Sequence, residues 1–155
     1  MIPPGSLGPG VKAEIATSYP HMLAEDTVVW TQYLRERGKF IKACWYDVHV
    51  GESVPVPTDL PPEIQTVSLA VTRKRIDVIA LMGGVYHIIE VKPWGGYVAL
   101  GQCLVYWRLF RSEYPRHRPT LPLIVCSALD EDCLAEFQFR RVGYYRVTLA
   151  SEGTG

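Results

Sequence analysis

Residues 75–92 read RIDVIALMGGVYHIIEVK, and this stretch decides the fold. Two runs rich in β-branched and aromatic residues flank Gly83-Gly84. Two adjacent glycines are a strong signal for a two-residue hairpin turn, because both central positions require a positive φ. We therefore predict that strands at 69–82 and 85–91 form an antiparallel hairpin around these glycines.

The turn also predicts which residues face each other across the hairpin. Met82 faces Val85, and the same register brings Asp77 opposite Glu90. Directly opposed residues have Cβ atoms about 4.5–5.5 Å apart, and the period of two places Lys92 on the same face as Glu90. Two carboxylates so placed repel each other unless a cation lies between them, and they suit a hard divalent cation such as Mg²⁺.

The two faces of the hairpin differ in character. One is apolar except for His87, whereas the other changes from apolar near the turn to Asp, Glu and Lys at the far end. A lysine beside a metal site can orient a water or stabilise charge that develops on a phosphate. The alternative is a surface ion pair on an exposed strand, which is common and contributes little to stability.

The remaining sequence predicts a mixed α/β sheet with helices packed on it. In chain order we expect a helix at 20–38, strands at 41–50, 69–82 and 85–91, a helix at 97–112, a strand at 121–127, a short helix at 131–138 and a strand at 143–149. The proline-rich segment 51–66 cannot be a central strand, and we predict a long exposed loop there.

Length and composition indicate one globular domain. The chain has 155 residues, of which 48% are hydrophobic and 21% charged. We assign the domain to residues 13–150, with flexible segments at 1–12 and 151–155. Sixteen basic and sixteen acidic residues exclude a globally basic mode of nucleic-acid binding, but not a local basic patch. We find neither a secretory signal nor a transmembrane run, so we expect a cytoplasmic protein with no membrane partner.

The pattern RIDVI at 75–79 with IIEVK at 88–92 resembles the PD-(D/E)xK nuclease superfamily. This resemblance implies a restriction-endonuclease-like αβββαβ core. It also implies that Asp77 and Glu90 bind Mg²⁺ or Mn²⁺, with help from the carbonyl of Val91, and that Lys92 assists hydrolysis of a phosphodiester.

The sequence departs from the superfamily pattern in three places, and the first is the long proline-rich gap between the first strand and Asp77. The other two are single residues. The residue before the aspartate is Ile76 rather than proline, and Pro93 directly follows the lysine. We expect Pro93 to end its strand.

Three further residues match motifs of particular superfamily members. Glu25 resembles an acidic residue early in the first helix of archaeal Holliday-junction resolvases, where it joins the metal site. Its alternative role is to interact with the helix dipole. Gln102 and Tyr106 match the Q-x-x-x-Y of RecB-like and exonuclease members on the helix after the lysine. The alternative is a glutamine at a helix edge beside a core tyrosine.

A phosphodiester substrate also requires cations near the site. Arg73, Lys74 and Arg75 lead into Asp77 and are candidates for nucleic-acid contact, although basic clusters are also common on solvated surfaces. Further basic groups follow in 108–118 and at 140–141. Trp94 either stacks on a base or covers the core.

These observations lead to two hypotheses about function. The first is a Mg²⁺- or Mn²⁺-dependent nuclease that hydrolyses DNA, linear, branched or single-stranded, with Asp77, Glu90, Lys92, Glu25 and Gln102 as its catalytic set. The sequence does not decide between a monomer and a homodimer. The second is a catalytically silent protein of the same fold that binds DNA or serves in assembly. A small-molecule hydrolase has no motif to support it.

Overall fold

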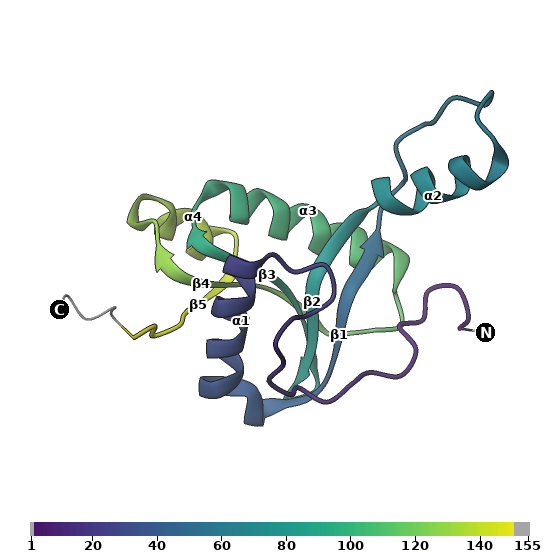
Figure 1. Ribbon diagram of the computed structural model, residues 1–155. Helices are drawn as coiled ribbons and strands as arrows, with labels where there is room; N and C mark the ends of the chain where they lie inside the picture. The colour runs from purple at the N-terminus through teal and green to yellow at the C-terminus, as the bar shows by residue number, and fades with distance from the viewer. Residues whose placement is uncertain (1, 151–155) are drawn as a thin grey trace.

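The computed structural model describes residues 2–150, including all of their side chains except those of residues 68–72. Its elements are the helix α1 (Ala24–Arg37), a 3-10 turn (Gly38–Phe40), β1 (Ile41–Val50), α2 (Pro62–Thr72), β2 (Lys74–Met82), β3 (Val85–Gly95), α3 (Tyr97–Glu113), β4 (Thr120–Leu129), a second 3-10 turn (Glu131–Cys133), α4 (Leu134–Phe139) and β5 (Gly143–Arg146). A mixed sheet flanked by helices confirms the predicted α/β class (Figure 1).

The strands lie side by side in the order β1-β2-β3-β4-β5. Strands β1, β2 and β3 pair with one another in antiparallel fashion, whereas β3, β4 and β5 pair in parallel. Helix α3 makes the connection between the parallel strands β3 and β4. Apart from α2, which lies between β1 and β2, the elements follow the predicted order of helix, three strands, helix and strand, and β5 extends the sheet at its far edge.

The hairpin at the centre of the sheet is built as the sequence predicted. Gly83 and Gly84 have φ values of 57° and 76°, and the ladder pairs Met82 with Val85 and Val78 with Ile89. A Cβ on either glycine would meet nothing within 4 Å, so it is the backbone conformation that requires glycine at these two positions.

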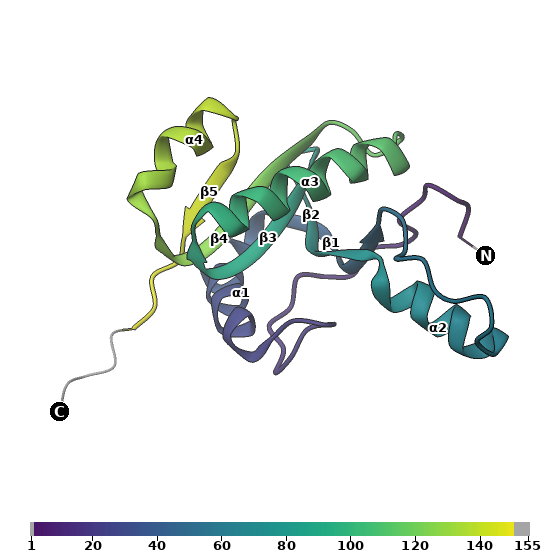
Figure 2. The ribbon, with the colours of Figure 1, turned by 90° about the horizontal axis from the view of Figure 1, so that it is seen from above.

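Both faces of the sheet are buried under helices. Helix α1 covers one face, where Trp30 and Val29 pack with strand residues such as Val78 and Ile89. Helix α3 covers the other face, where Phe110 packs with residues such as Ile79. Figure 2 shows α1 and α3 on opposite sides of the strands. Because each face is covered, a charged group on either strand needs a specific partner or an opening to solvent.

The segment between β1 and β2 corrects two predictions. Residues 62–72 form α2, so neither the loop predicted to reach 66 nor the strand predicted to begin at 69 is right. Pro62 occupies the first turn of this helix, where its fixed φ suits the backbone and its missing N–H costs nothing. The proline that argued against a strand thus begins a helix. Figures 1 and 2 both show α2 standing away from the sheet.

The predicted end of β3 is also wrong. The strand continues through Pro93 to Gly95, paired with β4. The ladder to β2 ends at Val78–Ile89, so no hydrogen bond to β2 depends on the amide that proline lacks.

Residues of the amino-terminal segment, which we predict to be flexible, lie against β1 in the structure. Val11 and Cys44 exchange two backbone hydrogen bonds of 2.9 Å, and the indole of Trp45 donates to the carbonyl of Gly8 at 3.0 Å. The predicted flexible tail at 151–155 lies outside the described residues. Among residues 2–150, we find no helix with the length and apolar character to cross a bilayer.

Candidate active site

The acidic end of the hairpin lies where the ladder between β2 and β3 opens. Asp77 Oδ2 accepts a hydrogen bond from the backbone N–H of Val91 at 2.9 Å. Glu90 is only 4% exposed, and its Oε2 has no hydrogen-bond partner among the described residues. Lys92 Nζ lies 3.6 Å from Glu90 Oε1. The structure therefore brings Asp77, Glu90 and Lys92 together, as the predicted register required.

The two carboxyl groups act strongly on each other. Burial and the charge of Asp77 raise the pKa of Glu90 to about 8, against the lowering effect of Lys92. Burial also raises the pKa of Asp77 to about 6, against the hydrogen bond from Val91, while the charge of Asp26 raises it further. Like charges in a buried place favour protonation or a bound cation. The ammonium group of Lys92 therefore does not fully compensate the negative charge of the two carboxylates.

Helix α1 contributes Asp26 rather than Glu25 to this site. Asp26 is 7% exposed, whereas Glu25 is exposed. Burial raises the pKa of Asp26, Lys92 lowers it and Glu25 raises it, so Asp26 lies within the field of the lysine. The helix begins at Ala24, and Asp26 lies on its buried side. The other buried residues of this stripe are Val29, Trp30, Tyr33 and Leu34. This spacing of three and four residues indicates Asp26 only once the start of the helix is known from the structure.

A second acidic residue that the sequence did not single out is Asp47 on β1. The β1–β2 ladder pairs Tyr46 with Val78 and Val48 with Ile76, which places Asp47 level with Asp77 on the neighbouring strand. The charge of Asp47 contributes to the raised pKa of Asp77. No periodicity marks Asp47, because its place depends on the pairing of β1 with β2.

Asp47 gathers basic side chains from three segments. Its Oδ2 lies 3.4 Å from His21 and 3.5 Å from His49, and Arg75 lies 3.6 Å from its Oδ1. Arg75, predicted to contact nucleic acid, is thereby directed to Asp47. The cluster places the Arg75 guanidinium and two imidazole groups around Asp47, whose charge in turn acts on Asp77.

Gln102 and Tyr106 lie one turn apart on α3 near the carboxylates. Burial raises the pKa of Tyr106, as do the charges of Glu90 and Asp77, while a hydrogen bond to Gln102 lowers it. Gln102 Oε1 is buried without a hydrogen-bond partner among the described residues. The structure thus brings this predicted pair to the site and leaves one amide oxygen to be satisfied there.

Trp94 does not cover the core. Its side chain is 57% exposed just beyond Lys92, on the last residues of β3. A Cβ on Gly95 would come within 2.8 Å of Cys126 Sγ, so the glycine next to Trp94 is required for close packing on β4. The exposed indole offers a flat apolar surface that can stack on a base.

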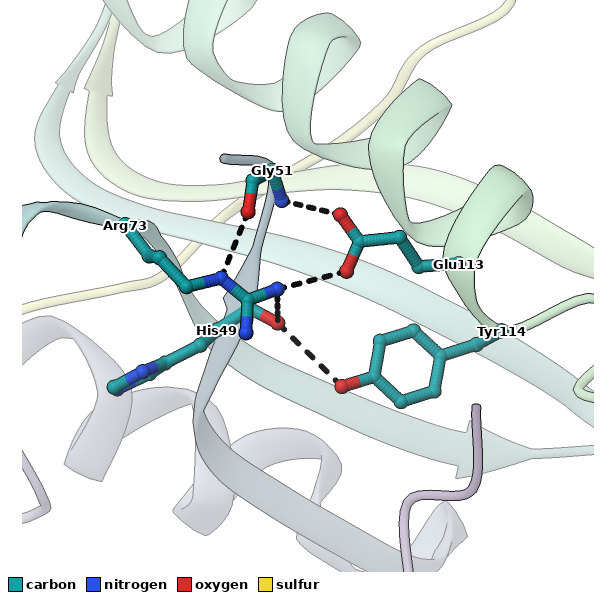
Figure 3. Close-up of polar contacts among 5 residues, drawn as sticks. All are labelled: His49, Gly51, Arg73, Glu113 and Tyr114. Carbon is teal, nitrogen blue, oxygen red and sulfur yellow. Dashed lines mark hydrogen bonds and ion pairs between the residues drawn. The ribbon is translucent and has the colours of Figure 1, made fainter. Parts of the chain in front are cut away.

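Arg73 holds three segments of the protein together (Figure 3). Its Nε donates to the carbonyl of Gly51 at 2.7 Å, and one terminal nitrogen donates to Glu113 at 2.9 Å and to the carbonyl of His49 at 3.4 Å. Tyr114 donates to the same His49 carbonyl at 3.4 Å. Arg73 was predicted to contact nucleic acid, but the structure engages it internally and leaves Lys74 exposed.

The donor set determines which metal suits the site. Among the described residues, no three His, Cys, Asp or Glu side chains converge closely enough to form a metal cage. Mg²⁺ needs no such cage, because it keeps several waters and is commonly held by one or two carboxylates plus a phosphate. The unpartnered oxygen of Glu90, opposite Asp77, therefore fits a hydrated Mg²⁺ or Mn²⁺.

Comparisons with known proteins give two similar structures. No protein-family model and no curated protein matches the sequence. A complex of EndoMS with double-stranded DNA has a TM-score of 0.47 and 11% identity, covering 87% of this chain and 51% of the other. A repair endonuclease from Pyrococcus abyssi has a TM-score of 0.45 and 13% identity, covering 85% of this chain and 49% of the other. The chain spans about half the length of each.

Proposed function

We propose that this protein is a metal-dependent nuclease that hydrolyses DNA phosphodiester bonds. Asp77 and Glu90 would hold Mg²⁺ or Mn²⁺, and the carbonyl of Val91 would complete the protein ligands. The observation that carries the proposal is the carboxylate pair of half-buried Asp77 and buried Glu90, with an unpartnered Glu90 oxygen and an ammonium group 3.6 Å away. A buried pair of this kind is costly to fold, and a functional ligand gives a reason to retain it.

The side chains around the pair have separate roles in this proposal. A bound cation would lower the pKa of a water and neutralise charge on the phosphate. Lys92 keeps its proton at Nζ and donates a hydrogen bond to the attacking water or to a phosphate oxygen. The charge of Asp26 acts on the same lysine and would add to the negative field that attracts its ammonium group to the site. Gln102 offers its unpartnered oxygen to the water, while Tyr106 orients that amide.

DNA is the proposed partner, and two exposed groups support this. The indole of Trp94 can stack on a base, and Lys74 can contact a phosphate. Both lie on the strands that carry the carboxylates. Glu25 is too exposed to be a direct ligand beside Asp77 and Glu90, so we assign it no catalytic role.

The direct test is cleavage of linear, branched and single-stranded DNA with Mg²⁺ or Mn²⁺. Asp77→Asn, Glu90→Gln and Lys92→Met should each reduce the rate by about 100-fold or more. The exposed residues Asp59 and Lys42 provide charge-matched controls, and Asp59→Asn and Lys42→Met should leave the rate unchanged. Equal activity in the wild type and the site variants would refute the proposal.

Calorimetric titration with Mn²⁺ separates the nuclease from the silent alternative. The wild type should bind Mn²⁺ in the millimolar range or tighter, and Glu90→Gln should abolish the heat. Absence of binding in the wild type would favour a protein that keeps the fold for DNA binding or assembly without catalysis.

A further inference from the structure

A large basic pocket lies at the carboxyl-terminal end of α3. Its volume is about 730 Å³, and it is lined by the last turns of α3, the loop 114–119 and the first residue of β4. The basic side chains on its wall are Arg108, Arg111, His117 and Arg118, and no acidic side chain lines it. In a chain with a formal net charge of zero, this is a local concentration of positive charge.

The arginines of this pocket are free to bind a ligand. Arg108, Arg111 and Arg118 are all exposed, and among the described residues none of them forms an ion pair. Arg108 and Arg111 are three residues apart on α3 and therefore lie on one side of the helix. Unlike Arg73 and Arg75, they have no carboxylate partner that would neutralise them.

The wall between these arginines is rigid. The guanidinium of Arg111 lies 4.7 Å from the centroid of the Trp107 ring, and the Trp107 indole donates to Thr120 Oγ1 at 3.0 Å. Arg118 Nε donates to the carbonyl of Pro115 within the loop. A guanidinium held against an aromatic ring loses less freedom when it binds a ligand, so its bidentate donor set is preorganised.

The pocket also contains an unsatisfied polar atom. His117 Nδ1 is buried and has no hydrogen-bond partner among the described residues. Its ring packs edge-on against Tyr86, with the centroids 5.2 Å apart. A buried polar atom without a partner costs about 1–3 kcal/mol.

We propose that this basic pocket binds backbone phosphates of nucleic acid, at a second contact point separate from the carboxylate site. Three unpaired guanidinium groups match the charge and the bidentate geometry of phosphates. Tyr86 pairs with Thr120 and Glu90 with Ile124, so the pocket lies four residues, about 13 Å, along β3 from the carboxylates. A duplex of a few base pairs spans this distance. The choice of nucleic acid as the source of the phosphate rests on the proposed function.

The experiment measures binding of a fluorescent 20-base-pair duplex by anisotropy in EDTA, so that no cleavage occurs. Arg108→Gln and Arg111→Gln should each weaken binding by about tenfold and reduce the salt dependence by about one phosphate contact. Arg111→Lys should recover the salt dependence but only part of the affinity, because lysine lacks the planar fork. Circular dichroism would confirm that these exposed substitutions leave the fold intact.

The control is Arg140→Gln, which removes the same charge directly after α4. Arg140 pairs with Glu136 at 3.3 Å, and α4 packs against the amino-terminal half of α3, far from the pocket (Figure 2). This variant should bind the duplex within twofold of the wild type. If Arg140→Gln weakens binding as much as Arg108→Gln does, the contact is a general charge effect and the proposal is overturned.

The test distinguishes failure of the pocket from failure of the nuclease. Weaker binding by Arg108→Gln without any cleavage by the wild type supports the pocket and rejects the nuclease. Normal binding by Arg108→Gln and Arg111→Gln with metal-dependent cleavage by the wild type rejects the pocket alone. If calorimetry shows that inorganic phosphate binds the wild type but not these two variants, while their DNA binding is unchanged, the ligand is a small phosphate compound and the nucleic-acid assignment is wrong.

Discussion

Asp77 Oδ2 accepts the backbone N–H of Val91 at 2.9 Å, at the point where the ladder between β2 and β3 has already ended. The carboxylate therefore satisfies a strand amide that lacks a β2 carbonyl, and the hydrogen bond fixes Asp77 next to Glu90. Its other oxygen accepts no hydrogen bond from the described residues, so it remains available to a cation. The opening of the hairpin, rather than its regular pairing, creates the candidate site.

Asp26 and Glu25 provide a matched pair for testing the contribution of α1. Asp26→Asn should weaken Mn²⁺ binding by about tenfold, because Asp26 is buried within the field of Lys92 and Asp77, whereas Glu25→Gln should change it by less than twofold. Calorimetry with Mn²⁺ measures both, and Mg²⁺ titration of the cleavage rate provides a second readout. A larger effect of Glu25→Gln would restore Glu25 as the helix ligand.

The stability of the metal-free protein should decrease as the pH rises. The pKa of Glu90 is raised from 4.5 to about 8, so between these values the folded protein keeps a proton that the unfolded chain has released. Its free energy of unfolding therefore falls across that window. Glu90→Gln should match the wild type below about pH 5 and exceed its stability by about 1 kcal/mol or more above pH 8.

Urea unfolding with EDTA across this pH range measures the effect, and Glu14→Gln serves as a control at an exposed carboxyl. Saturating Mg²⁺ should remove or reverse the trend in the wild type, because the cation binds the deprotonated pair. A wild-type stability that rises with pH in EDTA, with no gain from Glu90→Gln, would contradict this prediction.

Arg73 and Lys74 are sequence neighbours with different expected roles. Arg73→Gln should lower the free energy of unfolding by about 1–2 kcal/mol, because Gly51, His49 and Glu113 lose a shared donor (Figure 3). Lys74→Gln should leave stability unchanged, because the side chain is exposed. Thermal unfolding checks the stabilities, and DNA anisotropy should show a reduced salt dependence for Lys74→Gln only. A reduced salt dependence for Arg73→Gln with unchanged stability would show instead that Arg73 contacts nucleic acid.

Substitutions at three glycines test whether positive φ is what requires glycine in the hairpin turn. Gly83→Ala and Gly84→Ala should each destabilise the protein by about 1 kcal/mol, because both positions have positive φ although a Cβ would meet nothing. Gly101→Ala on α3 is the control, since a Cβ there also meets nothing but the backbone is helical. That change should stabilise by about 0.5–1 kcal/mol. A neutral effect at Gly83 and Gly84 in urea unfolding would show that the turn tolerates side chains.

Much of the site was predictable because it depends on one short hairpin. The glycine turn sets the register, and the register brings Asp77, Glu90 and Lys92 together without knowledge of the rest of the fold. Gln102 and Tyr106 were predictable for a similar reason, since four residues make one helical turn. The sequence did not indicate that Asp26, rather than Glu25, lies in the buried stripe of α1, because the exact start of the helix decides which acidic residue belongs to it.

By itself, the sequence determined the α/β class, the glycine hairpin and the proximity of Asp77 to Glu90, because these follow from backbone conformation and periodicity over neighbouring residues. Only the tertiary structure decided that Asp26 and Asp47 join the acids and that Arg73 turns inward while Arg108 and Arg111 stay free. Contacts between separate elements depend on how the helices pack and how the strands align, and no local pattern records that arrangement.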